Sequence, residues 1–260
     1  MAVIGIDLGT TNSLAGVWQD GKVVLIPNAF GEYLTPSVVS IGKNQEVFVG
    51  SVAKEMLATQ PYDTFREFKR NMGTNFLYGN GRKKYRAEEL SAFVLRRLKE
   101  DAEKFLGEEV TEAVISVPAY FDDNKRNATK NAGRLAGLKV ERLINEPSAV
   151  ALKHHTAEKG AESFIVFDFG GGTLDVSLVE AFDNVVEIQA VAGDNYLGGK
   201  DFNEIIAQDF YEQNQISEAY LTKNEQENVL KEAEAVKKEL TDKNEAERQV
   251  YIKGEAYTLK

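Results

Sequence analysis

The sequence lacks cysteine entirely, which excludes disulfides, thiol catalysis and a thiolate zinc site. The chain is therefore suited to a reducing compartment, and we expect it to be cytoplasmic. It also lacks an export signal of the usual kind, because Asp7 interrupts the first apolar stretch and no basic region precedes it. No apolar run approaches the length of about 20 residues that a membrane span needs, so we expect no membrane partner.

An excess of positive charge is missing as well. The net charge is −10, so nucleic acid phosphates and anionic membrane surfaces would be repelled at long range. Nucleic acid is thus not an expected partner, although local backbone dipoles can still bind a nucleotide. With 260 residues, 43% hydrophobic and 28% charged, the chain can bury a sizeable core and is expected to divide into two lobes.

Two stretches of the chain echo each other, residues 4–18 and residues 165–179. Each has an apolar strand, an aspartate, a turn of small residues and a second strand. With Asp7 aligned on Asp168, the corresponding turns are Gly9-Thr10-Thr11 and Gly170-Gly171-Gly172. Matched copies of one pattern indicate duplication.

The chemistry of these turns indicates a magnesium nucleotide. A Gly-rich reversal can direct successive backbone N–H groups at one anion. An aspartate beside the turn would repel bare phosphate but suits a hydrated magnesium ion that bridges phosphate oxygens. A single turn of this type is more often an ordinary hairpin, whereas two matched copies favour the nucleotide. A P-loop and a dinucleotide fingerprint are both excluded, because strand periodicity follows the glycines.

The region from 112 to 154 alternates strand and helix, as in an α/β sheet. A strand ends at Pro118, Asp122-Asp123 caps a helix that Gly137 ends, and a further strand leads to Glu146-Pro147. Glu146 thus sits where a strand's carboxyl end meets a helix start, the place where open sheets bind ligands. It could equally serve to complement the helix dipole.

Three other segments are ambiguous on pattern alone. Residues 64–72 show helical spacing, which makes Lys69 a surface lysine unless other information intervenes. The glycines of loop 193–199 either admit a ligand or simply turn the chain. A capping box at Thr222 opens a helix whose charged edge is either solvated or grips a polar ring; its residues are Glu234, Lys237, Lys238 and Thr241.

Several motifs, in this order and spacing, resemble the DnaK-type seventy-kilodalton heat-shock chaperones over nearly the whole chain. They are Gly5-Ile-Asp-Leu-Gly-Thr-Thr-Asn-Ser13, Val117-Pro-Ala-Tyr-Phe121, Ile144-Asn-Glu-Pro-Ser-Ala149, Phe167-Asp-Phe-Gly-Gly-Gly-Thr-Leu-Asp175 and Gly193-Asp-Asn-Tyr-Leu-Gly-Gly-Lys-Asp-Phe202. The segment from Pro27 to Pro36 and the pair Asp194-Asn195 look most like the HscC branch.

The resemblance implies an α/β, actin-like (ribonuclease-H-like) ATPase fold, in which two lobes with duplicated phosphate turns enclose Mg-ATP. Lys69 would orient the attacking water and offset charge at the γ-phosphate, and Glu146, Thr173 and Asp175 would help position water and metal. Asp7 and Asp168 would hold Mg²⁺ through its waters, and K⁺ is a further candidate cation. The implied nucleotide contacts are Gly9, Thr10, Thr11, Asn12, Gly170, Gly171, Gly172, Thr173, Glu234, Lys237 and Lys238.

The same resemblance implies how the domain communicates. Pro118 and Arg126 match a switch and relay to a separate peptide-binding domain, while Arg142 and Asn145 match a surface for J-domain co-chaperones. A nucleotide-exchange factor and, indirectly, unfolded client proteins complete the implied partners. Lys200 departs from the family's usual glutamate and Lys238 from an arginine of some members. Both departures bear on the opening of the outer second subdomain and on its exchange-factor contacts.

The family's ATPase domain extends beyond the equivalent of Lys260, so we expect an N-terminal fragment with an incomplete second lobe and exposed apolar surface. Lobe I is expected over 1–160, with a core of 1–36 and 112–160 and an outer subdomain of 37–111. Lobe II is expected over 161–260, with a core of 161–195 and an outer subdomain of 196–260. The alternatives are a catalytically incompetent interaction fragment and a sugar kinase or filament-forming relative on the same fold.

Overall fold

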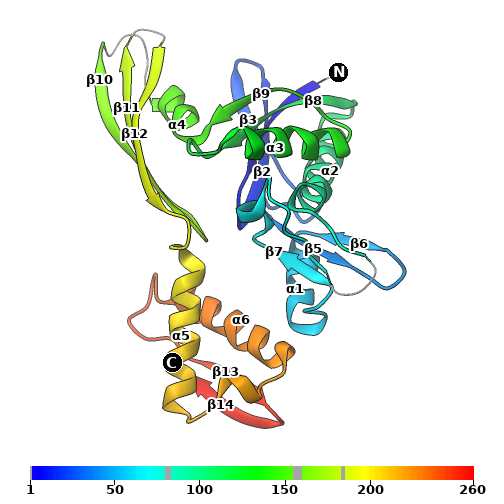
Figure 1. The fold of residues 1–260 in the computed structure, drawn as a ribbon, viewed down its shortest axis with the longest axis vertical. Helices are drawn as coiled ribbons and strands as arrows, with labels where there is room; N and C mark the ends of the chain where they lie inside the picture. Colours follow the sequence, from blue (N-terminus) through cyan, green and yellow to red (C-terminus); the bar gives the residue numbers. More distant parts are fainter. Residues whose placement is uncertain (1, 80–82, 155–159, 183–184) are drawn as a thin grey trace.

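A mixed six-stranded sheet forms the centre of the N-terminal part of the molecule. The computed structural model describes residues 2–79, 83–154, 160–182 and 185–260. The strand order is β3-β2-β1-β8-β9, with β4 paired to β2 (Figure 1). The strands are β1 (Ala2–Leu8), β2 (Asn12–Gln19), β3 (Lys22–Ile26), β4 (Thr35–Pro36), β8 (Val110–Val117) and β9 (Lys139–Asn145).

The sheet follows the predicted periodicities. In β1, alternate residues Ile4, Ile6 and Leu8 are buried against the helices, which leaves Asp7 on the opposite face. The first three strands form an antiparallel meander, whereas β1, β8 and β9 are parallel. Because parallel strands end at one sheet edge, Asp7, Pro118 and Glu146 are brought to the same region.

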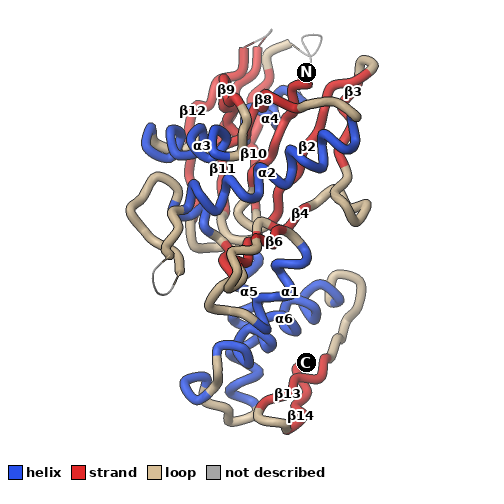
Figure 2. The backbone as a smooth tube through the Cα atoms, turned by 90° about the vertical axis from the view of Figure 1, so that its right-hand side faces the viewer, coloured by secondary structure: helices blue, strands red, loops and turns tan. Residues whose placement is uncertain are grey.

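Two long helices cover one face of this sheet (Figure 2). Helix α2 (Ala87–Leu106) ends at Gly107, whose left-handed backbone is typical of a helix C-terminus. Helix α3 (Asp123–Leu135) begins at Asp122, whose carboxylate accepts a hydrogen bond of 2.9 Å from the Lys125 amide. Their apolar faces join the main core, so the sheet edge that carries Asp7 rests on a rigid scaffold.

Residues 64–72 differ from the helix that their spacing predicts. Thr64–Arg66 forms β7, which pairs with β5 (Val38–Ile41), and β6 (Val47–Val49) completes a three-stranded sheet. A short 3-10 helix, η1 (Phe68–Asn71), follows Glu67, whose φ is +58°. The strand prevails because β5 supplies backbone partners, and the left-handed residue then redirects the chain. The same segment buries Lys69 to 7% exposure, so a surface lysine is the wrong interpretation.

A second sheet carries the repeated hairpin. It consists of β10 (Glu162–Phe169), β11 (Leu174–Phe182) and β12 (Val185–Asp194), all antiparallel. Helix α4 (Glu146–His154) packs between the two sheets and buries Ala151 against Val166 and Val179. The expected boundary between the lobes, at residues 160 and 161, directly follows residues outside the described part of the chain.

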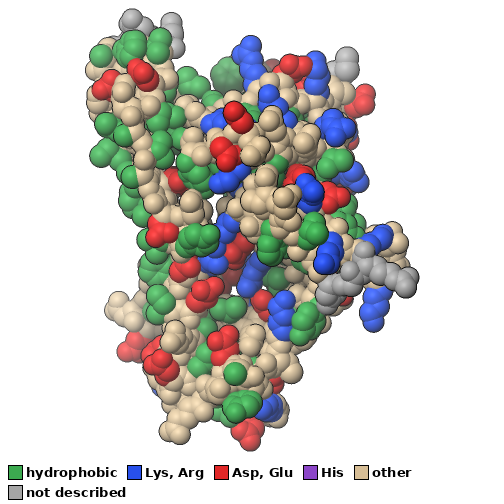
Figure 3. Space-filling view, in the orientation of Figure 1, with side chains coloured by type: hydrophobic (Ala, Val, Ile, Leu, Met, Phe, Trp, Pro, Cys, Tyr) green, Lys and Arg blue, Asp and Glu red, His purple; other side chains and the backbone are tan. Residues whose placement is uncertain are grey.

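One face of this second sheet is apolar and exposed, as expected. Ile165 and Phe167 are 67% and 65% exposed, and apolar side chains follow the β10–β12 edge at the left of Figure 3.

The last part of the chain forms a separate small core. Helices α5 (Gly199–Gln213) and α6 (Lys223–Glu239) pack on the hairpin of β13 (Arg248–Ile252) and β14 (Glu255–Leu259). The predicted capping box is present, since the Thr222 side chain accepts from the Glu225 amide and Glu225 accepts from Thr222. Helix α6 also packs against α1 (Ser51–Thr59) of the N-terminal part. Among the described residues, no helix has the length and apolar character that a membrane crossing requires.

Phe68 anchors the turn that presents Lys69, since its side chain is 1% exposed within the main core. We expect Phe68→Ala to lower the free energy of unfolding by about 3–5 kcal/mol, because a cavity is added to the lost apolar burial. The control is Phe30→Ala, in which a 63% exposed ring is removed. Urea unfolding measures both, and equal midpoints for the two variants would contradict the anchoring role.

Candidate functional site

The two repeated turns face each other across a cleft. The turn between β1 and β2 and the turn between β10 and β11 line one cavity of about 220 Å³. An ideal Cβ on Gly171 would lie 2.0 Å from the Thr11 hydroxyl, so glycine is required for this close approach. The lining residues are Asp7, Gly9, Thr10, Thr11, Asn12, Lys69, Arg70, Pro118, Tyr120, Phe121, Glu146, Asp168, Gly170, Gly171, Gly172 and Thr173.

The second turn is held in shape by the start of α5. The Gly199 and Lys200 amides donate to the carbonyls of Gly170 and Gly171 at 3.1 and 2.8 Å. An ideal Cβ on Gly198 would lie 2.3 Å from the Gly172 amide nitrogen, so the loop before α5 can approach only as glycine. The 193–199 glycines therefore pack against the candidate phosphate turn.

Two carboxylates from the two parts of the chain meet at the cavity. Burial raises the pKa of Asp168, and the nearby charge of Asp7 raises it further, while Lys69 opposes the rise. Asp7 accepts a 2.8 Å hydrogen bond from the Ser116 hydroxyl on the neighbouring strand. Two like charges that line one cavity favour a bound cation.

Lys69 and Glu146 form the buried ion pair of the cleft. Lys69 Nζ lies 2.9 Å from Glu146 Oε1, and the side chains are 8% and 17% exposed. Burial raises the pKa of Glu146, although the Lys69 charge and hydrogen bond oppose this rise. Lys69 also lies 5.9 Å from the centre of the Phe121 ring. The pair is thus a positive and a negative group held in fixed positions beside the turns.

Asp175 and Thr173 lie on the second hairpin, next to this pair. Asp175 lines a smaller neighbouring cavity together with Glu146 and Asp168. Its pKa is raised by burial and by Asp168, and lowered by a hydrogen bond from Thr173. Four acidic groups therefore converge on the cleft, namely Asp7, Glu146, Asp168 and Asp175.

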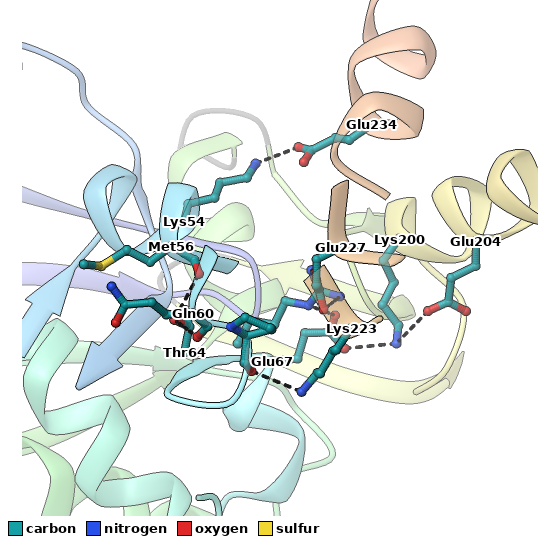
Figure 4. Close-up of polar contacts among 12 residues, drawn as sticks. Lys54, Met56, Gln60, Thr64, Glu67, Lys200, Glu204, Lys223, Glu227 and Glu234 are labelled. Atoms are coloured by element: carbon teal, nitrogen blue, oxygen red, sulfur yellow. Dashed lines mark hydrogen bonds and ion pairs between the residues drawn. The ribbon is translucent and has the colours of Figure 1, made fainter. Parts of the chain in front are cut away.

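The three predicted adenosine contacts on α6 lie outside the lining of this cavity. Glu234 pairs with Lys54 of α1 at 2.8 Å (Figure 4). It also pairs with Lys238 at 2.7 Å. Burial raises the Glu234 pKa, but these hydrogen bonds and charges outweigh it and lower the pKa to about 2. Lys237 donates to the Gly199 carbonyl, which places it near the second turn.

The predicted switch and relay residues form one connected group. Pro118 lines the cavity at the end of β8. Arg126 on α3 donates to the Phe121 carbonyl at 2.8 Å and to the Asn145 side chain at 2.7 Å. Arg142, on β9, is exposed on the surface. The structure therefore links the cavity wall to Asn145 through Arg126.

Sequence reasoning missed two side chains of the cavity wall. Arg70 donates to the Gly172 carbonyl and lies 5.7 Å from the centre of the Tyr196 ring. Tyr120 is half-buried there, and burial together with the Asp175 and Glu146 charges raises its pKa. The available signal was that Arg70 follows Lys69 directly and that Tyr120 lies two residues after Pro118. Closeness in the sequence does not, however, reveal a contact with the second hairpin.

The residues present fit a phosphate chain and a hydrated magnesium ion. The turn Gly170-Gly171-Gly172 has no Cβ atoms, and Gly171 lies too close to Thr11 of the first turn for any larger residue, so its backbone can approach an anion as backbone recognition of phosphate requires. Asp7 and Asp168 face that space as a repelling pair of hard oxygen donors, which suits Mg²⁺ that keeps several waters. Over the described residues, no group of three or more acidic or imidazole side chains is arranged to bind a metal directly.

This fold and its paired turns define an actin-like ATPase domain of mixed α/β architecture. A family model described as Hsp70 protein matches residues 3–80 and 77–257. The chain therefore belongs to the Hsp70 family, as the resemblance implied, and carries a chaperone nucleotide-binding domain. Members of this family are ATPases, and their domains in general bind ATP or ADP with Mg²⁺.

The raised pKa of Asp168 implies that this carboxylate destabilises the nucleotide-free fold. A carboxyl whose folded pKa exceeds its unfolded value weakens the fold above the folded pKa, and the penalty disappears as pH falls below the unfolded pKa. We therefore expect Asp168→Asn to unfold at a higher temperature than the parent at pH 7, with a difference that shrinks towards pH 3. The exposed Asp242→Asn is the matched control. Calorimetric scans of apo protein test this, and a lower midpoint for Asp168→Asn at pH 7 would contradict it.

Proposed function

We propose that the chain binds Mg-ATP between its two halves and hydrolyses it to ADP and phosphate. The observation that supports this most strongly is the Lys69–Glu146 pair, buried at 2.9 Å beside two facing phosphate turns. A buried ion pair is weak evidence for stability, since desolvation offsets its attraction. Its position at the lining of a polar cavity instead favours a chemical role.

In the proposed reaction, a water molecule attacks the γ-phosphorus while the bond to the bridging β–γ oxygen breaks. ADP leaves with that oxygen, and the attacking water gives one proton to an oxygen of the released phosphate. Lys69 would orient the water and offset charge at the γ-phosphate, and Glu146, held by Lys69, would accept a hydrogen bond from the water. Thr173 and Asp175 would complete the water's surroundings. No protein nucleophile is needed, because positioning and electrostatics supply the catalysis.

The phosphates would lie between Gly9-Thr10-Thr11-Asn12 and Gly170-Gly171-Gly172-Thr173. When bound, Mg²⁺ would neutralise charge on the phosphate oxygens. Asp7 and Asp168 would hold its waters, and Ser116 fixes the Asp7 carboxylate by its 2.8 Å hydrogen bond. K⁺ is a second cation that this acidic cleft would accept.

The proposed lobes follow the two sheets, with lobe I over residues 1–160 and lobe II over residues 161–260. Their outer subdomains, 37–111 and 196–260, meet where α1 packs on α6. Glu234, Lys237 and Lys238 would face the adenosine from α6 once the phosphates occupy the turns. The Lys54–Glu234 ion pair then spans the entrance and must break or shift when the nucleotide leaves.

The nucleotide state would reach partners through Pro118 and Arg126. In support, the Phe121 amide donates to the Pro118 carbonyl at 3.1 Å and the Phe121 carbonyl accepts from Arg126 at 2.8 Å. Asn145, which accepts from Arg126 at 2.7 Å, would belong with Arg142 to a J-domain surface. The exposed Arg142 would contribute to a J-domain surface. A peptide-binding domain, an exchange factor and unfolded clients are the other proposed partners. Within the family, the Pro27–Pro36 segment and Asp194-Asn195 favour an HscC-like branch of the DnaK type.

Lys69→Ala is the direct test of hydrolysis. Removal of the ammonium takes away water orientation and charge compensation, so we expect turnover to fall by about 10²–10³. Lys43→Ala, which removes an exposed lysine, is the control and should retain parental turnover. Single-turnover phosphate release with Mg-ATP measures the rate. Parental turnover in Lys69→Ala would exclude Lys69 from catalysis.

Gly171→Ala tests nucleotide binding separately from chemistry. The added methyl meets Thr11, and such overpacking costs about 1–3 kcal/mol, which corresponds to roughly tenfold weaker binding per 1.4 kcal/mol. Gly42→Ala is the control, since its new Cβ would make an ordinary 3.6 Å contact. Calorimetric titration with Mg-ATP and Mg-ADP measures affinity. Absence of heat for both nucleotides with the parent chain would instead favour an interaction module without nucleotide binding.

A further inference from the structure

Lys200 is placed unusually for a surface lysine. It is the second residue of α5, in the first helical turn, where the helix dipole disfavours a cation. Its side chain is 26% exposed, although lysine ordinarily keeps its charge in water. An unfavourable position of this kind needs a compensating anion. Figure 4 shows Lys200 between carboxylates on opposite sides, one of them Glu204 of its own helix.

The compensating anion belongs to the other half of the chain. Lys200 Nζ lies 3.0 Å from Glu67 Oε2, closer than its 3.7 Å separation from Glu204 Oε1. Glu67 precedes η1, so it is two residues from Lys69. The contact therefore crosses the cleft directly beside the proposed catalytic lysine.

Glu67 is itself held in a costly conformation. Its φ of +58° is in the left-handed region, which non-glycine residues adopt rarely. This conformation presents its carboxylate to three cations. Arg70 Nη1 lies 3.3 Å away, Arg66 Nε lies 3.8 Å away, and Lys200 approaches from the opposite lobe. The Glu67–Lys200 ion pair offsets two costs, namely the left-handed backbone at Glu67 and the placement of a lysine at the start of a helix.

The same cluster contacts the second phosphate turn. Arg70, paired with Glu67, donates to the Gly172 carbonyl, while the Lys200 amide donates to the Gly171 carbonyl. Glu67 thus links η1, the phosphate turn and α5. Movement of α5 away from η1 would separate Lys200 from Glu67 and release the Arg70 contact.

We propose that Glu67 and Lys200 form a clasp that holds the two lobes closed around the nucleotide and keeps Lys69 in position. The expected effect of the clasp on ADP release rests on the proposed function, whereas its effect on the distance between the lobes does not. Loss of the clasp opens the cleft in the nucleotide-free chain and speeds ADP release. Lys200 and Glu67 act as positioning residues, since neither lines the cavity.

The test uses a double-mutant cycle of Lys200→Gln and Glu67→Gln in the full 260-residue chain. Lys200→Arg keeps the charge, and Glu204→Gln removes the neighbouring carboxylate of the same helix without touching the clasp. Because the chain has no cysteine, Lys43→Cys and Asp242→Cys place spin labels on exposed sites of the two lobes. Pulsed electron spin resonance gives the distance distribution between the labels, and a fluorescent ADP gives the release rate.

Each glutamine variant should lengthen and broaden the label distance in nucleotide-free protein. Each should also speed ADP release by about fivefold, as for a pair worth roughly 1 kcal/mol. The double variant should change the label distance and the ADP release rate no more than either single variant does, because each single substitution already removes the same contact. Lys200→Arg and Glu204→Gln should behave as the parent.

Unchanged label distances in Lys200→Gln, or effects of the two glutamine variants that simply add, would overturn the clasp. If the parent chain binds ADP, an unchanged rate of ADP release in the glutamine variants would also overturn the clasp. Altered distances in a chain that binds no nucleotide would uphold the clasp and overturn the proposed function instead. The two proposals therefore fail separately.

Discussion

The site depends on one electrostatic constraint, which is the concentration of carboxylates in one cleft. Asp7, Glu146, Asp168 and Asp175 converge there, and burial raises the pKa of the last three. The Lys69 charge opposes that rise in each of the three carboxyls. A single buried ammonium therefore partly compensates the negative charge of the cluster when no metal cation is bound. The fold tolerates the arrangement because sheet edges and two long helices hold the strand ends rigidly.

The same constraint explains why the halves of the chain are joined by charge. The contacts between α1 and α6 and between η1 and α5 include the ion pairs Lys54–Glu234 and Lys200–Glu67. Partly exposed pairs are individually weak. They can therefore break and re-form as a ligand enters, which an extensive apolar interface could not do at comparable cost. The apolar burial that stabilises the chain lies within each core, away from the cleft.

Much of the local structure was predictable because it is encoded locally. Apolar patterning predicted β1 and β11, Asp122 predicted the start of α3, and the Thr222 capping box predicted the start of α6. The segment 64–72 shows where local reasoning fails. Its spacing suited a helix, but pairing with β5 made Thr64–Arg66 a strand. Backbone partners far along the chain outweighed a weak local preference.

The sequence by itself determined the paired turns, the order of strands and helices, and the membership in a nucleotide-binding family. Each of these depends on residue types within a few positions of one another. Tertiary structure alone decided that Lys69 is buried on Glu146, 77 residues away, and that Arg70 reaches Gly172, 102 residues away. It also decided that Lys200 faces Glu67. Such contacts depend on how two separately encoded halves close on each other, and no local periodicity specifies that closure.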